Sequence, residues 1–176
     1  AFEDAVIERL IAYGWEENIL EYKTEAELLD NWAAILFENN RDIDRLGDYP
    51  LTDGEKRQLI DQVNTLRTPN SINSLINGKN IIITRDNPED VAHCGKEVSL
   101  KIYDRQEIAA GQSRYQIVRQ PYFNTAIPLA SDRRGDLTLL INGMPLIHIE
   151  LKKSGIPVSQ ATNQIEKYAH EGIFSK

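Results

Sequence analysis

The stretch of sequence that decides the fold is RRGDLTLLINGMPLIHIELKK, residues 133–153. Two apolar runs flank the dipeptide Asn142-Gly143, and this pattern predicts a β-hairpin closed by a tight turn. Alternate side chains along a strand share a face, so Glu150 and Lys152 point to the same side of the second strand. The apolar residues between and before them face the other side. The hairpin therefore presents an acid and a lysine beside a buried apolar face.

Two registers of this hairpin are open. A two-residue turn pairs Asp136 with Ile149 and places apolar and charged side chains on the same face. A three-residue loop, residues 141–143, instead pairs Asp136 with His148 and brings the apolar rows of both strands together. A bulge farther along either strand would restore the same parity. Apolar patterning predicts the three-residue loop, in which Asp136 is the diagonal neighbour of Glu150.

Asp136, Glu150 and Lys152 together have the chemistry of a divalent-cation site. Mg²⁺ prefers oxygen ligands and usually keeps several waters, so both carboxylates and one backbone carbonyl, that of Leu151, would leave positions for water and phosphate. Lys152 would stabilise an attacking hydroxide and the charge that develops on the phosphate. Solvated charges on an exposed strand are the alternative interpretation. Strong apolar flanks favour a site, because they predict a central hairpin in which charged side chains are costly.

Outward from the hairpin, the chain reads as helices, then strands, then a helix. Apolar side chains recur at helical spacing over residues 2–13, and capping-box patterns begin two further helices at Thr24 and Thr52. A last helix is predicted over residues 159–171. This order predicts an α/β or α+β fold in a single domain, residues 1–176. The β-prone runs of the second half are residues 81–84, 98–103, 115–118, 137–141 and 146–151.

Composition limits the class of protein. The chain has 176 residues, of which 41% are hydrophobic and 27% charged, so it is globular rather than fibrous or disordered. Its apolar runs are too short to span a bilayer, its N-terminus lacks the pattern of a secretory signal, and its single cysteine indicates a reducing, cytoplasmic setting. A net charge of −7 disfavours tight DNA binding by the chain alone. It does not exclude a nucleic-acid substrate, because a local basic cluster can contact phosphates.

The hairpin resembles a known family. Arg-Gly-Asp, an apolar strand, Asn-Gly-x-Pro, a second apolar strand and Glu-Leu-Lys-Lys are together similar to the PD-(D/E)xK nuclease motif. They resemble in particular the N-terminal endonuclease domain of the R (HsdR) subunit of type I restriction enzymes. Downstream, Gln164-x-x-x-Tyr168 is similar to the extra motif of the RecB-like branch of that superfamily. The resemblance covers essentially the whole chain, and it departs from the motif at Gly135, where proline is named.

The resemblance implies a restriction-endonuclease-like fold, with a mixed central sheet flanked by helices. It also implies roles for the residues that match. Asp136 and Glu150 would bind the metal, and Lys152 would be the catalytic lysine. Gln164 and Tyr168, which share one face of the predicted helix, would support the site or contact DNA.

The remaining candidates each carry an alternative. A first-helix glutamate reaches the metal in some members of the superfamily, which makes Glu8 a candidate ligand, with a solvated helix face as the alternative. Arg134 and Lys153 would bind phosphates near the scissile bond, unless they are solvated charges. His148 stands where such strands are usually apolar. Its role is open between a buried, hydrogen-bonded histidine and a ligand or proton-transfer group.

The function that follows is a Mg²⁺-dependent endonuclease domain, with Mn²⁺ as a substitute, that hydrolyses double-stranded DNA after ATP-driven translocation. No Gly-x-x-x-x-Gly-Lys-Ser/Thr phosphate loop occurs, so ATP would be bound by a C-terminal translocase region of the same subunit. The resemblance implies the methyltransferase and specificity subunits as partners. It implies no association with a membrane. The alternatives are a repair nuclease or junction resolvase of the same fold, and a non-catalytic docking module.

Overall fold

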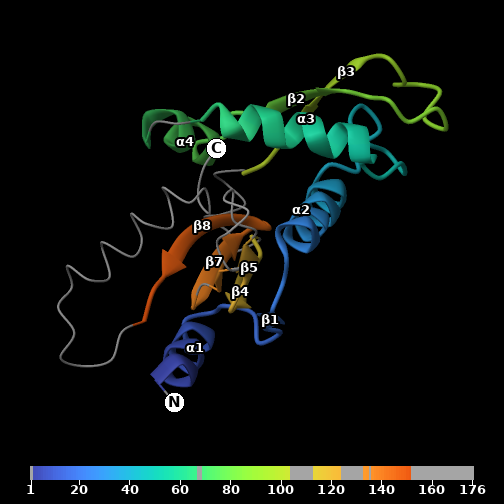
Figure 1. The fold of residues 1–176 in the computed structure, drawn as a ribbon. Helices are drawn as coiled ribbons and strands as arrows, with labels where there is room; N and C mark the ends of the chain where they lie inside the picture. The colour runs from blue at the N-terminus through green and yellow to red at the C-terminus, as the bar shows by residue number, and fades with distance from the viewer. Residues whose placement is uncertain (1, 67–68, 104–112, 124–132, 135, 152–176) are drawn as a thin grey trace. The chain divides into compact units, whose positions relative to one another are not determined.

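A computed structural model describes residues 2–66, 69–103, 113–123, 133–134 and 136–151 (Figure 1). The chain divides into two compact units. The first unit comprises the chain up to Leu28 and from Arg114 onwards, and it contains the predicted hairpin. The second unit comprises Leu29–Ser113. The assignment of residues 1–176 to one domain stays a prediction.

The first unit is built on a mixed four-stranded sheet with the strand order β1-β4-β7-β8. β1 and β4 run parallel, whereas β4, β7 and β8 are successively antiparallel. Helices and a mixed sheet confirm the predicted fold class. The elements of this unit are α1 (Phe2–Ala12), β1 (Leu20–Glu21), the start of α2 (Glu25–Asn39), β4 (Tyr115–Arg119), β5 (Tyr122–Phe123), β6 (Arg133–Arg134), β7 (Leu137–Ile141) and β8 (Met144–Ile149).

The hairpin β7–β8 corrects the predicted register. Its loop is the two-residue turn Asn142-Gly143, and both residues have positive φ, 51° and 83°. Positive φ at both central positions is the geometry that matches the twist of paired strands, and Asn-Gly adopts it readily. The three-residue loop was therefore wrong. The alternative of a bulge is confirmed, because the register shifts between Leu139 and Leu140. This bulge brings the apolar side chains of the two strands onto the same face, as the apolar pattern requires.

Each face of the sheet packs against a different helix. The face that carries Ile117 and Leu137 is covered by α1, whose Ile7 is buried against it. The other face carries Val118 and packs on Leu28 in the first turns of α2. Partly buried residues that extend the first cluster are Val6, Leu10, Ile11, Trp15, Ile19, Ile149 and Leu151. Apolar residues alternating along β4 and β7 thus face two cores.

The second unit contains the rest of α2, α3 (Asp53–Asn64), α4 (Pro69–Ile76), and the antiparallel pair β2 (Ile81–Thr84) and β3 (Glu97–Leu100). The capping boxes predicted at Thr24 and Thr52 are both confirmed. Each threonine exchanges hydrogen bonds with the glutamate three residues later, Glu27 and Glu55 respectively. The sequence pattern did not predict α4, which begins at Pro69. Proline is tolerated at the first helical position, where its missing N–H is not needed.

α3 holds β2 through side-chain amides. The amide of Gln58 donates to the carbonyl of Thr84 at 2.9 Å and accepts from its N–H at 2.8 Å, as a neighbouring strand would. Gln62 donates to the carbonyl of Ile82 at 2.6 Å. These bonds satisfy main-chain groups of β2 that β3 does not pair.

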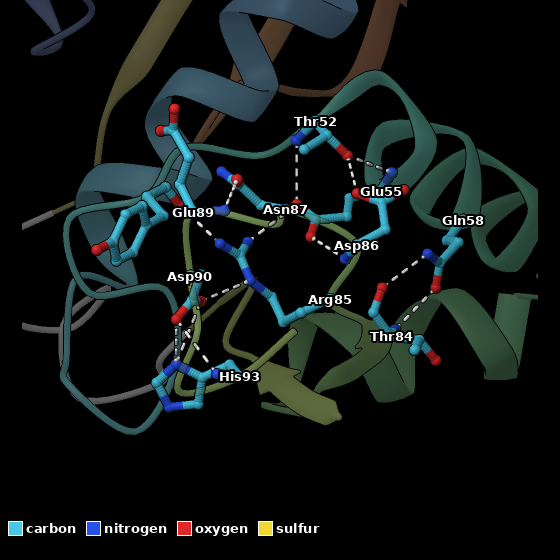
Figure 2. Close-up of polar contacts among 11 residues, drawn as sticks. Thr52, Glu55, Gln58, Thr84, Arg85, Asp86, Asn87, Glu89, Asp90 and His93 are labelled. Atoms are coloured by element: carbon cyan, nitrogen blue, oxygen red, sulfur yellow. Dashed lines mark hydrogen bonds and ion pairs between the residues drawn. The ribbon is translucent and has the colours of Figure 1, made fainter. Parts of the chain in front are cut away.

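A buried arginine organises the loop that joins β2 to β3 (Figure 2). The guanidinium of Arg85 donates to Glu55 at 2.9 Å, to Asp90 at 3.2 Å and to the carbonyl of Tyr49 at 3.0 Å. His93 lies 2.9 Å from the same aspartate. Burial works to raise the pKa of Asp90, but the contacts with His93 and Arg85 outweigh it and hold that pKa below its usual value. Each buried charge of the network therefore has an oppositely charged partner.

Candidate metal centre

The candidate site lies where three strands bend together. β5 and β6 pair in the same register as β4 and β7. The β5–β6 ladder therefore continues the β4–β7 ladder, with an interruption at Gln120 and Asp136. The N–H of Gln120 still donates to the carbonyl of Asp136 at 2.8 Å. Gln120 has a φ of 48°, and Tyr22, at the same level beyond β1, has a φ of 54°. These left-handed residues bend the strands directly beside the first predicted ligand.

The hairpin sets Asp136 against the end of β8. The last ladder pair is Leu137 with Ile149, so the next residues outward, Asp136 and Glu150, lie opposite each other. The carboxylate of Asp136 accepts a hydrogen bond from the N–H of Leu151. The two acids are therefore direct neighbours across the strands, rather than the diagonal neighbours expected from the three-residue loop.

Glu150 faces the side of the sheet that is opposite to α1. Its neighbours Ile149 and Leu151 pack in the core beneath α1, and alternation along the strand turns Glu150 the other way. The side chain of Glu150 is only 5% exposed. Such burial is costly for a carboxylate without compensating charge or hydrogen bonds. Glu150 therefore needs a polar or cationic partner.

The donor set suits a small, hard cation. Asp136 and Glu150 supply carboxylate oxygens, and the carbonyl of Leu151 adjoins them in the chain. Within the described ranges, no group of three or more His, Cys, Asp or Glu side chains is placed to hold a metal ion. Mg²⁺ is commonly bound by one or two carboxylates and keeps several waters, so this smaller set still fits it.

Comparison with known proteins decides the family. A family model described as the type I restriction enzyme R protein N terminus matches residues 2–175. The chain belongs to this family. The R protein N-terminal resemblance read from the hairpin is thereby confirmed.

Curated relatives are similar over nearly the whole chain or over about half of it. The endonuclease subunit of a type I restriction enzyme of Staphylococcus saprophyticus is 34% identical over 99% of the chain, and one of Staphylococcus aureus is 30% identical over 99%. The endonuclease subunit of the type I restriction enzyme EcoprrI of Escherichia coli is 37% identical over 47% of the chain. The chain spans 17% of the length of each staphylococcal relative.

Several predicted residues of this R protein N-terminal region lie outside the described residues: Lys152, Lys153, Gln164 and Tyr168. Arg134 lies on β6, where it pairs with Tyr122. Glu8 is exposed on α1, and α1 packs on the face opposite to Glu150. The structure brings together Asp136, Glu150 and Leu151, and it does not add Glu8 to them.

Two residues near the site were missed by sequence reasoning. Gln120 shapes the bend, but glutamine gives no signal for positive φ. Thr138 lies opposite His148 on the face that carries Glu150, with Oγ1 3.3 Å from Nδ1 of the imidazole. A hydroxyl within an otherwise apolar strand was the signal that could have found it.

The described residues include no helix whose length and apolar character would let it cross a membrane.

Proposed function

We propose that the chain is the nuclease region of a type I restriction endonuclease subunit and hydrolyses phosphodiester bonds of double-stranded DNA with Mg²⁺ or Mn²⁺. The observation that carries this proposal is the register of β7 and β8, whose outermost pair, Leu137 with Ile149, sets Asp136 opposite Glu150, together with the hydrogen bond from the Leu151 N–H to the Asp136 carboxylate. The relatives described as endonuclease subunits support it.

The chain's own residues would divide the work as follows. Asp136, Glu150 and the Leu151 carbonyl hold the cation. Glu8 is not included, because it is exposed on α1, which packs on the opposite face of the sheet. When bound, the cation stabilises the negative charge that develops on the phosphate. Lys152 stabilises the attacking hydroxide.

Other predicted residues would contact DNA or support the site. Arg134 and Lys153 bind phosphates near the scissile bond. Gln164 and Tyr168, four residues apart, lie on one helical face and either support the site or contact DNA.

The whole enzyme would supply what this region lacks. We propose that a C-terminal translocase region of the same subunit binds ATP and moves DNA, and that the methyltransferase and specificity subunits recognise the target sequence. In this scheme, residues 1–176 form one nuclease domain that acts in the cytoplasm.

The test is cleavage by the assembled enzyme, with substitutions in the full-length subunit. Asp136→Asn, Glu150→Gln and Lys152→Ala should each reduce DNA cleavage at least a hundredfold, while ATP-driven translocation continues at the wild-type rate. Asp48→Asn is a matched control, because the side chain of Asp48 is 85% exposed and remote in the chain.

Three results would contradict the proposal. Cleavage by Asp136→Asn at the wild-type rate would place the catalytic metal elsewhere. Failure of the wild-type subunit to bind Mn²⁺ at millimolar concentration, measured by calorimetry, would favour a docking module. Cutting of branched DNA in preference to linear duplex would instead favour a junction resolvase.

A further inference from the structure

His148 joins two polar residues on the face of the sheet that carries the candidate metal ligands. It lies directly across the ladder from Thr138 and two residues before Glu150. Nδ1 of His148 is 3.3 Å from Oγ1 of Thr138. Nε2 is 3.5 Å from Oε2 of Glu150. The imidazole therefore contacts a hydroxyl with one nitrogen and a buried carboxylate with the other.

One tautomer of the neutral imidazole satisfies both contacts. With its proton on Nε2, His148 directs an N–H toward the carboxylate of Glu150, and Nδ1 accepts from the hydroxyl of Thr138. The other tautomer would turn a lone pair toward the carboxylate, which is repulsive. The carboxylate of Glu150 thus favours the tautomer in which the Nε2–H of His148 faces it, and the hydroxyl of Thr138, which can donate or accept, donates to Nδ1 in that tautomer. No change of charge is needed.

The side chains of His148, Glu150 and Thr138 are largely buried, which is unusual for polar residues on a sheet face. The side chain of His148 is 14% exposed and that of Glu150 is 5% exposed. Thr138 is buried as well. Polar side chains are expensive on a buried sheet face, and the apolar residues typical of this strand position would pack there without that cost. His148 and Thr138 are therefore better explained by what they do to Glu150 than by packing.

We propose that His148 is a positioning residue for the metal centre. It holds one carboxylate oxygen of Glu150, so that the other oxygen is directed to the cation, and Thr138 fixes the imidazole. The inference rests on the proposed function, in which Glu150 is a ligand. Outer partners of this kind orient the ligands that touch the metal, and their loss weakens metal binding about tenfold to a hundredfold.

The experiment compares four substitutions in the full-length subunit: His148→Val, His148→Gln, Thr138→Val and Ile147→Val. Ile147 is the control, because it adjoins His148 on β8 and its own side chain is half exposed on the opposite face. Mn²⁺ binding is measured by calorimetry without ATP. Heat that persists when Asp136→Asn is added to each variant is subtracted, since it comes from other sites.

His148→Val should weaken Mn²⁺ binding about tenfold to a hundredfold, and Thr138→Val should weaken it less. His148→Gln should restore most of the affinity, because a glutamine amide can accept from Thr138 and donate to Glu150. Cleavage in the assembled enzyme should need correspondingly more Mn²⁺ for half-maximal rate while the maximal rate is retained. Ile147→Val should change neither quantity. A purely structural role would lower the melting temperature without this rescue.

Wild-type affinity in His148→Val, or equal effects of valine and glutamine, would overturn the inference. If His148→Val fails to fold, as judged by circular dichroism, Thr138→Val and His148→Gln still decide the question. Failure of the proposed function looks different: Glu150→Gln would then bind Mn²⁺ and cleave like the wild type. Loss of cleavage in Glu150→Gln together with unchanged Mn²⁺ binding in His148→Val would overturn only the role of His148.

Discussion

The buried residue Glu55 has two structural roles. Its carboxylate accepts from the N–H of Thr52 at 3.0 Å, from the N–H of Asp86 at 2.9 Å and from Arg85 at 2.9 Å. It therefore caps α3 and neutralises a buried arginine at the same time. The sequence predicted only the first of these roles, because a capping box is local, whereas Arg85 is 30 residues away in the chain.

Replacing Glu55 should be severe. Glu55→Ala removes the cap and leaves the fully buried Arg85 with one carboxylate partner, so the free energy of unfolding should fall by about 3–5 kcal/mol. Urea unfolding followed by circular dichroism measures this. Asp53→Ala is the matched control in the same helical turn, because that aspartate is 88% exposed and pairs with Lys56 at the surface. Its effect should stay below about 1 kcal/mol. Equal losses in the two variants would contradict a dominant role for the buried pair.

Asp90 gives this network a dependence on pH. Because the pKa of Asp90 is lower in the folded chain than its ordinary value of 3.8, the ionised carboxylate stabilises the fold at neutral pH. That contribution is complete above the ordinary value and is lost as the pH falls through the lower, folded value. Urea midpoints measured from pH 7 down to pH 3 should fall more steeply for the wild type than for Asp90→Asn. Parallel curves would show that Asp90 does not contribute.

Among the elements, the bend after β1 and β4 is the feature that shapes the candidate site. Tyr22 and Gln120 have positive φ, which is unfavourable for residues with a Cβ. The bend lies beside Asp136, at the point where this residue leaves the ladder between β4 and β7. The N–H of Gln120 donates a hydrogen bond to the carbonyl of Asp136 and holds its backbone in place. The site therefore depends on backbone geometry as well as on its carboxylates.

Substitutions at Gln120 should separate these contributions. Gln120→Gly relieves a conformation that costs about 1–2 kcal/mol, so stability should hold or rise slightly. Gln120→Val places a β-branched side chain at a φ of 48°, and unfolding should become easier by about 1–3 kcal/mol. Cleavage by the assembled enzyme should also fall in the valine variant, because the position of Asp136 changes. If glycine and valine behave alike, the left-handed conformation is not important.

The hairpin shows which parts of an element can be predicted. Alternation predicted which residues of β8 share a face, because side-chain period in a strand is local and regular. The three-residue loop was wrong and the alternative with a bulge was right, since both combinations give the same parity and only the structure distinguishes them. The bend at Gln120 could not be predicted at all. It arises from pairing between strands that are distant in sequence.

At the scale of the whole molecule, the net charge of the chain bears on how it meets DNA, and its length bears on what the rest of a full-length subunit would supply. The chain carries a net charge of −7 and spans 17% of the staphylococcal subunits. Near the bend, Arg119 is surrounded by carboxylates, with Glu3 and Asp4 each 3.0 Å away and Glu21 3.8 Å away. A basic side chain that is neutralised in this way adds little attraction for a phosphate backbone.

The chain by itself should therefore bind DNA weakly. Non-specific binders typically reach dissociation constants of about 1–100 µM at physiological salt, and an acidic chain should lie at or beyond the weak end of that range. Fluorescence anisotropy with a labelled duplex, at about 150 mM salt and without divalent cations, tests this for the 176-residue chain. The assembled enzyme in the same buffer is the comparison, and it should bind at least a hundredfold more tightly, because its other subunits and its translocase region would supply the contacts. A dissociation constant below about 1 µM for the chain alone would show that it docks on DNA unaided. Delivery by the assembly would then not be needed to explain how this acidic chain reaches a polyanion.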